Sequence, residues 1–163
     1  MSQQKIVPNL WFDTQAEEAA NYYIDVFGGG QVLSTTRYPE GSPGPTGSVM
    51  TVEFEVTGMR FVGINGGPEF PFTEAVSLQV NCADQAEVDG YWDRLIADGG
   101  QESQCGWLRD RYGLSWQIIP AGMDELFRDP DTARAQRAMQ AMLGMRKLDV
   151  AALRAAADGV PVG

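Results

Sequence analysis

The chain repeats itself at a constant offset of 70 residues, and this repeat constrains the fold more than any other feature of the sequence. Gln15-Ala16-Glu17 returns as Gln85-Ala86-Glu87, Gly29-Gly30-Gln31 returns as Gly99-Gly100-Gln101, and between these motifs Tyr22 and Val26 correspond to Trp92 and Ile96. The two copies therefore enclose segments of equal length. Such a repeat predicts two copies of one supersecondary unit.

The first copy has the pattern of a β-α-β-β-β unit. Alternating apolar and polar residues predict strands at residues 6–12, 31–38, 48–56 and 59–64. A helix is predicted over 14–27, with Asp13 or Thr14 as its N-cap and Gly28-Gly29-Gly30 as its C-terminal stop. Proline and glycine predict a mobile loop at 40–45, and Thr57-Gly58 is predicted to turn the last hairpin.

The second copy repeats this order with shorter strands, and a helical tail follows it. Strands are predicted at 75–81, near 101–109 and at 114–119, with a helix over 85–98 and a turn at 110–113. After Pro120 the pattern becomes helical, with one helix starting at 129–131 and a last helix capped by Asp149 and ending at Gly159. Met139, Met142 and Met145 share an apolar stripe, which predicts core packing or a dimer contact.

These elements predict an α+β fold. Two paired βαβββ modules are expected to form a curved mixed sheet around a cleft, with helices outside and a C-terminal helical tail. Module one covers about 1–70, module two about 71–120 and the tail about 121–163. A chain of 163 residues is long enough to bury a core, and we expect residues 1–163 to form a single domain.

Charge and composition exclude several classes of function. With 12 basic and 22 acidic residues the formal charge is −10, which argues against binding to nucleic-acid phosphates. No apolar run approaches the ~20 residues that span a bilayer, and no signal peptide is recognised, so no membrane partner is expected. Cys82 and Cys105 make no disulfide framework, and a cytoplasmic location is expected. The chain has no histidine, the commonest metal ligand.

Strand parity predicts which side chains face the cleft, because successive side chains point to opposite faces of a sheet. Apolar side chains are assigned to the helix side of three strands: Met50, Val52 and Phe54; Val76, Leu78 and Val80; Leu114, Trp116 and Ile118. Polar and aromatic side chains then fall on the cleft side, where amides, hydroxyls and an indole suit a polar or aromatic small molecule. The predicted ligand-binding residues are Asn9, Trp11, Glu53, Ser77, Gln79, Trp107 and Gln117.

Two residues on the strands predicted to line the cleft are candidates for chemistry. A carboxylate desolvated in a cleft can serve as a general acid or base, so Glu53 is one candidate, the alternative being a solvated residue on a half-exposed sheet. Cys105 is the other, with Arg109 and Arg111 near it in sequence to stabilise a thiolate; the alternative is a packed, inert cysteine. Trp107 is interpreted either as a stacking wall for the ligand or as core.

Several segments carry a resemblance to a known family. They are Pro8-Asn9-Leu10-Trp11-Phe12-Asp13, Val49-Met50-Thr51-Val52-Glu53-Phe54, Asn65-Gly66-Gly67-Pro68, Val76-Ser77-Leu78-Gln79-Val80-Asn81, Gln104-Cys105-Gly106-Trp107-Leu108, Gly113-Leu114-Ser115-Trp116-Gln117 and, in the tail, Ala138-Met139-Gln140-Ala141-Met142-Leu143. Together with the paired modules, they resemble the PhnB-like branch of the vicinal oxygen chelate (glyoxalase/bleomycin resistance/dioxygenase) superfamily. Members of this branch often carry the label 3-demethylubiquinone-9 3-methyltransferase-like.

The resemblance implies three positions for the ligands of a divalent metal. They fall near Val7 or Pro8, near Ala75 or Ser77, and at Gln117, of which only Gln117 has a ligating side chain of the kind the superfamily uses. A neutral amide alone does not hold a divalent ion, so we expect no metal and no cofactor, with Glu53 and Gln117 together as the fallback metal site. The methyltransferase label would need a glycine-rich turn from a strand into a helix, whereas both glycine clusters follow helices.

The sequence therefore predicts a metal-independent small-molecule-binding protein of the glyoxalase/bleomycin resistance type. By analogy with the superfamily, a homodimer is expected. One alternative is a metal-free enzyme that uses Glu53 or Cys105. The other is a structural or interaction module that uses the C-terminal helices.

Overall fold

The computed structural model describes residues 3–160, which belong to two compact units, Met1–Phe72 and Thr73–Gly163. Whether the two form one domain, as the sequence predicts, stays a prediction.

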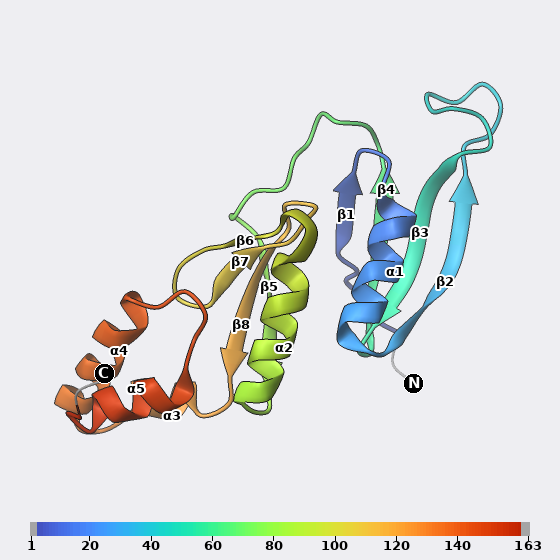
Figure 1. Ribbon diagram of the computed structural model, residues 1–163. Coiled ribbons are helices and arrows are strands. Elements are labelled where there is room, and N and C mark those ends of the chain that lie inside the picture. Colours follow the sequence, from blue (N-terminus) through green and yellow to red (C-terminus); the bar gives the residue numbers. More distant parts are fainter. Residues whose placement is uncertain (1–2, 161–163) are drawn as a thin grey trace. The chain divides into compact units, whose positions relative to one another are not determined.

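The first unit is one β-α-β-β-β module (Figure 1). Its elements are β1 (Asn9–Phe12), α1 (Ala16–Phe27), β2 (Gly30–Arg37), β3 (Val49–Val56) and β4 (Met59–Asn65). The strands form a sheet in the order β1-β4-β3-β2, in which β1 and β4 are parallel and the other pairs antiparallel. The four predicted strands and the helix are confirmed, although β1 starts three residues later than predicted.

The second unit contains the other copy of the module. Its elements are β5 (Ser77–Cys82), α2 (Gln85–Ile96), β6 (Gln101–Glu102), β7 (Trp107–Arg109) and β8 (Ser115–Pro120), and the sheet order is β5-β8-β7-β6 with β5 and β8 parallel. The same connectivity and the same strand order appear in both units, which confirms the sequence repeat. The predicted helix 85–98 is too long, because a 3-10 turn (Ala97–Gly99) follows Ile96 and Asp98 adopts a φ of 55°.

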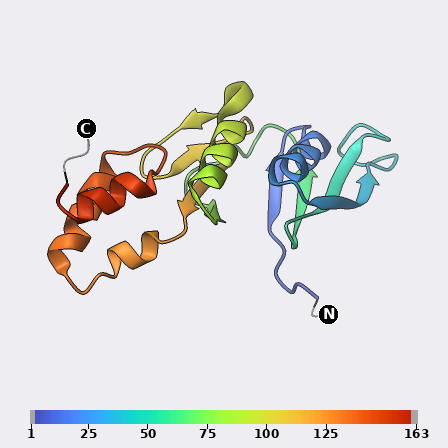
Figure 2. The same cartoon turned by 60° about the horizontal axis from the view of Figure 1, so that its bottom comes forward.

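The tail forms three helices after β8, in red and orange in Figure 2. They are α3 (Met123–Phe127), α4 (Thr132–Leu143) and α5 (Val150–Ala157). Their shared core contains the buried Leu126, Ala138 and Leu153, and Met142 and Met145 pack against it, whereas Met139 is 41 % exposed. Two of the three methionines of the predicted stripe therefore serve the core of the tail.

Aspartate side chains cap the N-termini of three helices. Asp84, Asp131 and Asp149 accept hydrogen bonds from backbone N–H groups in the first turns of α2, α4 and α5, as predicted for Asp149 and for the start at 129–131. The prediction for α1 is wrong, because neither Asp13 nor Thr14 is its N-cap and the N-cap residue Gln15 makes no side-chain capping bond.

A side chain from β4 replaces the missing cap of α1. The Oδ1 atom of Asn65 accepts from the backbone N–H of Ala16 at 2.8 Å, and its amide donates to the carbonyl of Val49 at 3.1 Å. The C-terminal stop is as predicted, since Gly28 has a φ of 69° and its N–H bonds the carbonyls of Ile24 and Asp25.

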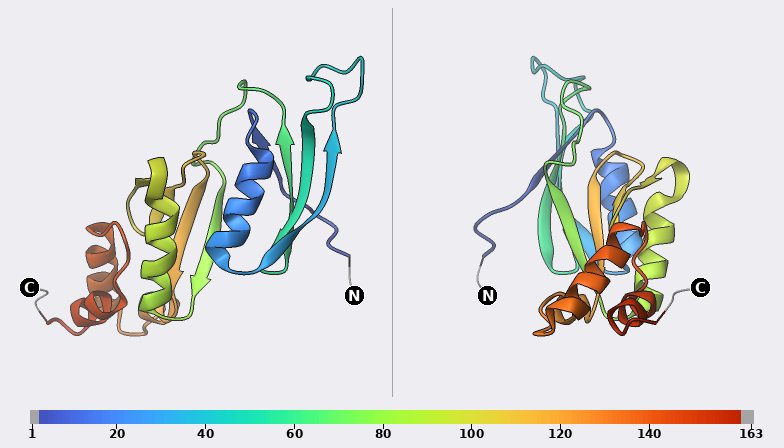
Figure 3. Two further views of the ribbon diagram at one scale, coloured as in Figure 1. Left: turned by 45° about the vertical axis from the view of Figure 1, so that its right-hand side comes forward. Right: turned by 90° about the vertical axis from the view of Figure 1, so that its left-hand side faces the viewer.

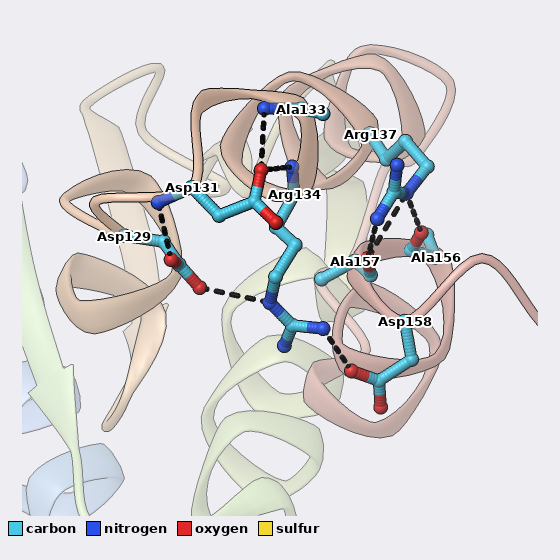
Figure 4. A network of polar contacts seen from close by, with 8 residues as sticks. All are labelled: Asp129, Asp131, Ala133, Arg134, Arg137, Ala156, Ala157 and Asp158. Carbon is cyan, nitrogen blue, oxygen red and sulfur yellow. Dashed lines mark hydrogen bonds and ion pairs between the residues drawn. The ribbon is translucent and has the colours of Figure 1, made fainter.

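Charged side chains fasten the last two helices of the tail to each other (Figure 4). The guanidinium of Arg134 on α4 bridges Asp129, at 2.9 Å, and Asp158 after α5, at 2.5 Å. Arg137 donates to the carbonyls of Ala156 and Ala157, which satisfies groups at the end of α5 that have no partner inside the helix.

Helix α1 and helix α2 each lie against one face of their own sheet (Figure 3). Because α1 covers one face of the first sheet, side-chain burial alternates along β3. Val52, Phe54 and Val56 are buried toward α1, and the residues between them are half-buried. On β8, Trp116 and Ile118 are buried as predicted. No helix among residues 3–160 is long and apolar enough to cross a membrane.

Candidate functional site

Each sheet has a second face that points away from its helix. We call these the first far face, in the unit Met1–Phe72, and the second far face, in the unit Thr73–Gly163. The seven predicted ligand-binding residues divide between them. Asn9, Trp11 and Glu53 belong to the first far face, and Ser77, Gln79, Trp107 and Gln117 to the second.

On the first far face, strand register brings Asn9 and Glu53 near each other. Asn9 on β1 and Glu53 on β3 are both partners of Val62 on the strand between them. Glu53 is ion-paired with Arg60 on β4, and Ser34 on β2 donates to its other oxygen at 3.2 Å. A carboxylate already bonded to a guanidinium and a hydroxyl suits a structural or ligand-positioning role better than proton transfer.

Trp11 is occupied by its own unit. Its indole N–H donates to the carbonyl of Gly67 at 2.9 Å, and Phe70 meets the ring edge-on at a centroid distance of 4.9 Å. Gly66 lies so close to the indole that an added Cβ would fall 2.1 Å from a ring atom. Trp11 therefore anchors the chain that leaves β4, and its role in ligand binding stays a prediction.

The second far face collects three predicted residues into one row. Gln117 on β8 is the register partner of Gln79 on β5 and of Trp107 on β7. The amide of Gln117 donates to the hydroxyl of Ser77 at 2.9 Å, and the amide of Gln79 donates to Asn81 at 2.8 Å. Both bonds use the amide nitrogens, and within residues 3–160 neither side-chain oxygen accepts a hydrogen bond. The row therefore presents two amide oxygens beside an indole.

Trp107 differs from the other three tryptophans of the chain. The indole N–H groups of Trp11, Trp92 and Trp116 donate to Gly67, Glu102 and Asp110 at 2.9 Å each. Within residues 3–160 the N–H of Trp107 donates to no protein acceptor, although its side chain is half-buried. This N–H is not among the buried polar atoms that lack a partner, so it is open to solvent, and Trp107 can both stack on a ligand and donate to it.

A further polar atom of this sheet lies beside the row, and sequence reasoning did not include it among the ligand residues. Ser115 on β8 is fully buried, and its hydroxyl has no hydrogen-bond partner. Its register partners are Ser77 and Arg109. Ser115 lies on the same side of β8 as Gln117, but burial is a tertiary property that strand parity does not give. The assignment of Val76 to the helix side is wrong, since Val76 precedes β5 and is 69 % exposed.

The two cysteines are in different environments. Burial, with the charges of Glu87 and Asp84, raises the pKa of the Cys82 thiol to about 11, so Cys82 is an inert thiol in neutral solution. Cys105 is half-buried in the turn before β7. The two cations near it in sequence are engaged by carboxylates, Arg109 by Glu74 at 3.4 Å and Arg111 by Asp98 at 2.9 Å.

The donors on the second far face do not fit a divalent metal. Gln117 and Ser77, at two of the positions implied by the superfamily, are neutral and hydrogen-bond each other at 2.9 Å. Among residues 3–160 no group of three or more His, Cys, Asp or Glu side chains could hold a metal ion. Glu53 and Gln117 belong to different units, so their joint site stays a prediction.

Comparison with known proteins identifies the family. The model of the family described as 3-demethylubiquinone-9 3-methyltransferase matches residues 4–119, which is more than half of the chain. The chain belongs to this family. The PhnB protein from Bacillus cereus, described as a putative 3-demethylubiquinone-9 3-methyltransferase, has a solved structure that is 35 % identical to this family member. The alignment covers 72 % of the present chain and 100 % of the other, with a TM-score of 0.66. No curated protein matches the sequence.

More distant solved structures share the fold of the family. Protein PA1353 from Pseudomonas aeruginosa is 22 % identical, with 72 % of this chain and 98 % of the other covered and a TM-score of 0.59. The fosfomycin resistance protein FosX from Listeria monocytogenes is 14 % identical, with 77 % and 97 % covered and a TM-score of 0.51. The family match and the likeness to PhnB confirm that the chain belongs to the vicinal oxygen chelate superfamily, as the resemblance implied.

The family match ends before the tail. Residues 120–163, including the segment 138–143, lie outside the family model, so the resemblance of that segment stays a prediction. Helices α3 to α5 are thus an addition to the part of the chain that matches the family.

Proposed function

We propose that this family member is a metal-independent small-molecule-binding protein of the glyoxalase/bleomycin resistance type. Its ligand binds the second far face, where it stacks on Trp107 and hydrogen-bonds Gln79 and Gln117. A polar aromatic compound fits these groups best, because an indole offers a stacking surface and amides offer both donors and acceptors. We also retain, as proposed ligand-binding residues, the polar and aromatic residues predicted on the first far face, which are Asn9, Trp11 and Glu53.

The observation that carries this proposal is the half-buried indole of Trp107, whose solvent-open N–H donates to no acceptor within residues 3–160. The chain gives every other tryptophan an acceptor at 2.9 Å. Trp107 on β7 is the register partner of the half-buried Gln117 on β8, so the two side chains lie on the same face of the sheet. A preformed row of an indole and two amides has the composition of a small-molecule site.

Metal independence is supported by the charge of the donors. A divalent cation needs anionic or imidazole ligands to repay its dehydration, and Ser77, Gln79 and Gln117 are all neutral. The methyltransferase name of the family is not part of the proposal. Gly28 caps the C-terminus of α1, and Gly99 and Gly100 follow α2, so neither glycine cluster leads from a strand into a helix.

We also propose that the protein functions as a homodimer, on the analogy with the superfamily. Sedimentation velocity at several protein concentrations tests this directly. A single monomeric species throughout would contradict it.

A thermal-shift screen of polar aromatic compounds tests the proposed site. A compound present at 100 times its dissociation constant should stabilise the protein by about 2.7 kcal/mol. The shift should disappear in Trp107→Ala combined with Gln79→Ala, and it should persist in Gln140→Ala, which changes an exposed glutamine of α4. A shift that survives the double substitution would refute the site.

Metal analysis tests the other half of the proposal. Protein purified without chelators should contain no stoichiometric nickel, zinc or manganese. Stoichiometric metal that is lost in Gln117→Ala would overturn metal independence.

A further inference from the structure

The tail returns to the second unit through residues 145–150, which we call the latch segment. Its carbonyl groups accept backbone hydrogen bonds from the turn that precedes β7. The N–H of Cys105 donates to Met145 at 2.8 Å, and the N–H of Gly106 donates to Arg146 at 2.7 Å. Consecutive N–H groups of the turn are therefore satisfied by consecutive carbonyls of the tail.

Gln85, the first residue of α2, holds the other end of the latch segment. Its amide nitrogen donates to the carbonyl of Leu148 at 2.8 Å, and its amide oxygen accepts from the N–H of Val150 at 3.0 Å. Between these bonds the side chain of Leu148 is fully buried. Lys147 adds an ion pair with Asp89 on α2 at 3.0 Å.

The turn held by the latch segment has an uncommon backbone. Cys105 has a φ of 58° and Gly106 a φ of 84°. For a residue other than glycine, such as Cys105, a positive φ costs conformational free energy. A conformation of this kind persists only where its surroundings hold it. Leu148 packs directly on Gly106, because a Cβ added there would lie 2.8 Å from its Cδ1 atom.

The sheet itself supports this turn less than its counterpart in the first unit. In the first unit β2 and β3 have eight residues each, whereas β6 has two and β7 three. β6 ends at Glu102, so the edge of the sheet next to Cys105 and Gly106 is bonded by the tail instead. The next residue after Gly106 is Trp107.

We propose that the latch segment positions Trp107 on the second far face, with Leu148 and Gln85 as positioning residues for the ligand site. The tail beyond the family match is then a functional part of this site. An effect of the latch segment on ligand binding rests on the proposed function, because it requires that Trp107 contact the ligand. An effect of the latch segment on the position of Trp107 does not depend on the proposed function.

Fluorine NMR of the full chain labelled with 5-fluorotryptophan tests the proposal without a ligand. The four tryptophans give four resonances, and Trp107→Phe and Trp11→Phe identify two of them. In Leu148→Ala, the Trp107 resonance should shift or broaden while that of Trp11, which belongs to the first unit, stays in place. Gln85→Met keeps the side-chain length, removes both hydrogen bonds to the latch segment and should act in the same direction.

Leu153→Ala is the matched control. Leu153 is as fully buried as Leu148, but it lies in the core that the tail helices share. This variant should destabilise the tail and leave the Trp107 resonance unchanged. The proposal is overturned if Leu148→Ala and Gln85→Met leave that resonance in place, or if Leu153→Ala moves it equally. Gln85→Met carries the test alone if Leu148→Ala does not fold.

The same spectrum separates this proposal from the proposed function. A compound that stabilises the wild-type protein should move the Trp107 resonance. A compound that raises Tm without moving it contradicts the proposed site and leaves the positioning result unaffected.

Discussion

Gln117 donates its side-chain amide to the hydroxyl of Ser77 at 2.9 Å, across the parallel pair of β8 and β5. This bond fixes the orientation of Gln117, so that its amide oxygen is left for another donor. Parallel pairing of the first and last strands of the module brings together two residues that are 40 apart in the chain.

Ser77→Ala should remove this orientation. The half-buried amide of Gln117 loses its acceptor, which should lower the free energy of unfolding by about 1 kcal/mol and weaken binding of any ligand found by the screen. Urea unfolding and thermal shift measure the two effects. Ser103→Ala, which changes an exposed serine of the same unit, should change neither.

Glu53→Gln tests whether Glu53 is an ion-paired residue or a proton-transfer group. Loss of the pair with Arg60 should cost about 1 kcal/mol or less, because both side chains are partly exposed, at 28 % and 33 %. The cost should shrink between about 0.01 M and about 1 M salt, as screening increases. Urea unfolding at both salt concentrations measures it.

Glu55→Gln is the matched control for Glu53→Gln. Glu55 is the next outward-facing carboxylate on β3, and it should show a smaller salt-dependent cost. A turnover activity that disappears in Glu53→Gln while the fold persists would instead support the metal-free enzyme.

Cys82 should make the protein less stable in alkali. Its pKa is raised from 9.0 to about 11 in the folded state, so the unfolded chain releases the thiol proton at lower pH. The stabilisation is complete below pH 9.0 and is lost as the pH rises through about 11. Cys82→Ala should therefore show a shallower decrease in the free energy of unfolding over this range. Parallel pH profiles of variant and wild type would contradict the assignment.

Gly106→Ala should be more destabilising than Gly113→Ala. Both glycines have similar φ angles, 84° and 89°. Either alanine should therefore lower the free energy of unfolding by about 1–2 kcal/mol, because alanine disfavours the left-handed backbone. Only at Gly106 does the new Cβ also meet Leu148, whereas nothing lies within 4 Å at Gly113. The extra cost should decrease when Gly106→Ala is combined with Leu148→Ala in a double-mutant cycle, measured by urea unfolding. Additive effects would show that the two residues do not contact each other.

Arg134→Met should loosen the end of the tail. The guanidinium joins Asp129 to Asp158, so its loss should speed amide hydrogen exchange in α5 and leave exchange in α1 unchanged. Arg128→Met removes an exposed arginine in the same unit and serves as the control. Equal protection of α5 in wild type and Arg134→Met would contradict the role of the bridge.

The sequence alone determined most of the helices and strands of both modules. Strand parity correctly assigned Val52, Phe54, Trp116 and Ile118 to the helix side, and glycine chemistry correctly ended α1 at Gly28. These properties depend on residues a few positions apart, and the repeat supplied the pattern twice. The family followed from motifs within 4–119.

Only the tertiary structure decided which residues of distant segments meet. Asn65 replaces the expected cap of α1, Arg60 engages Glu53, and Gly67 takes the indole N–H of Trp11. The row of Gln79, Gln117 and Trp107 and the latch segment beside it depend on register between strands and on the return of the tail. Such contacts join residues that are far apart in the sequence, so they depend on tertiary packing and cannot be predicted from a local sequence pattern.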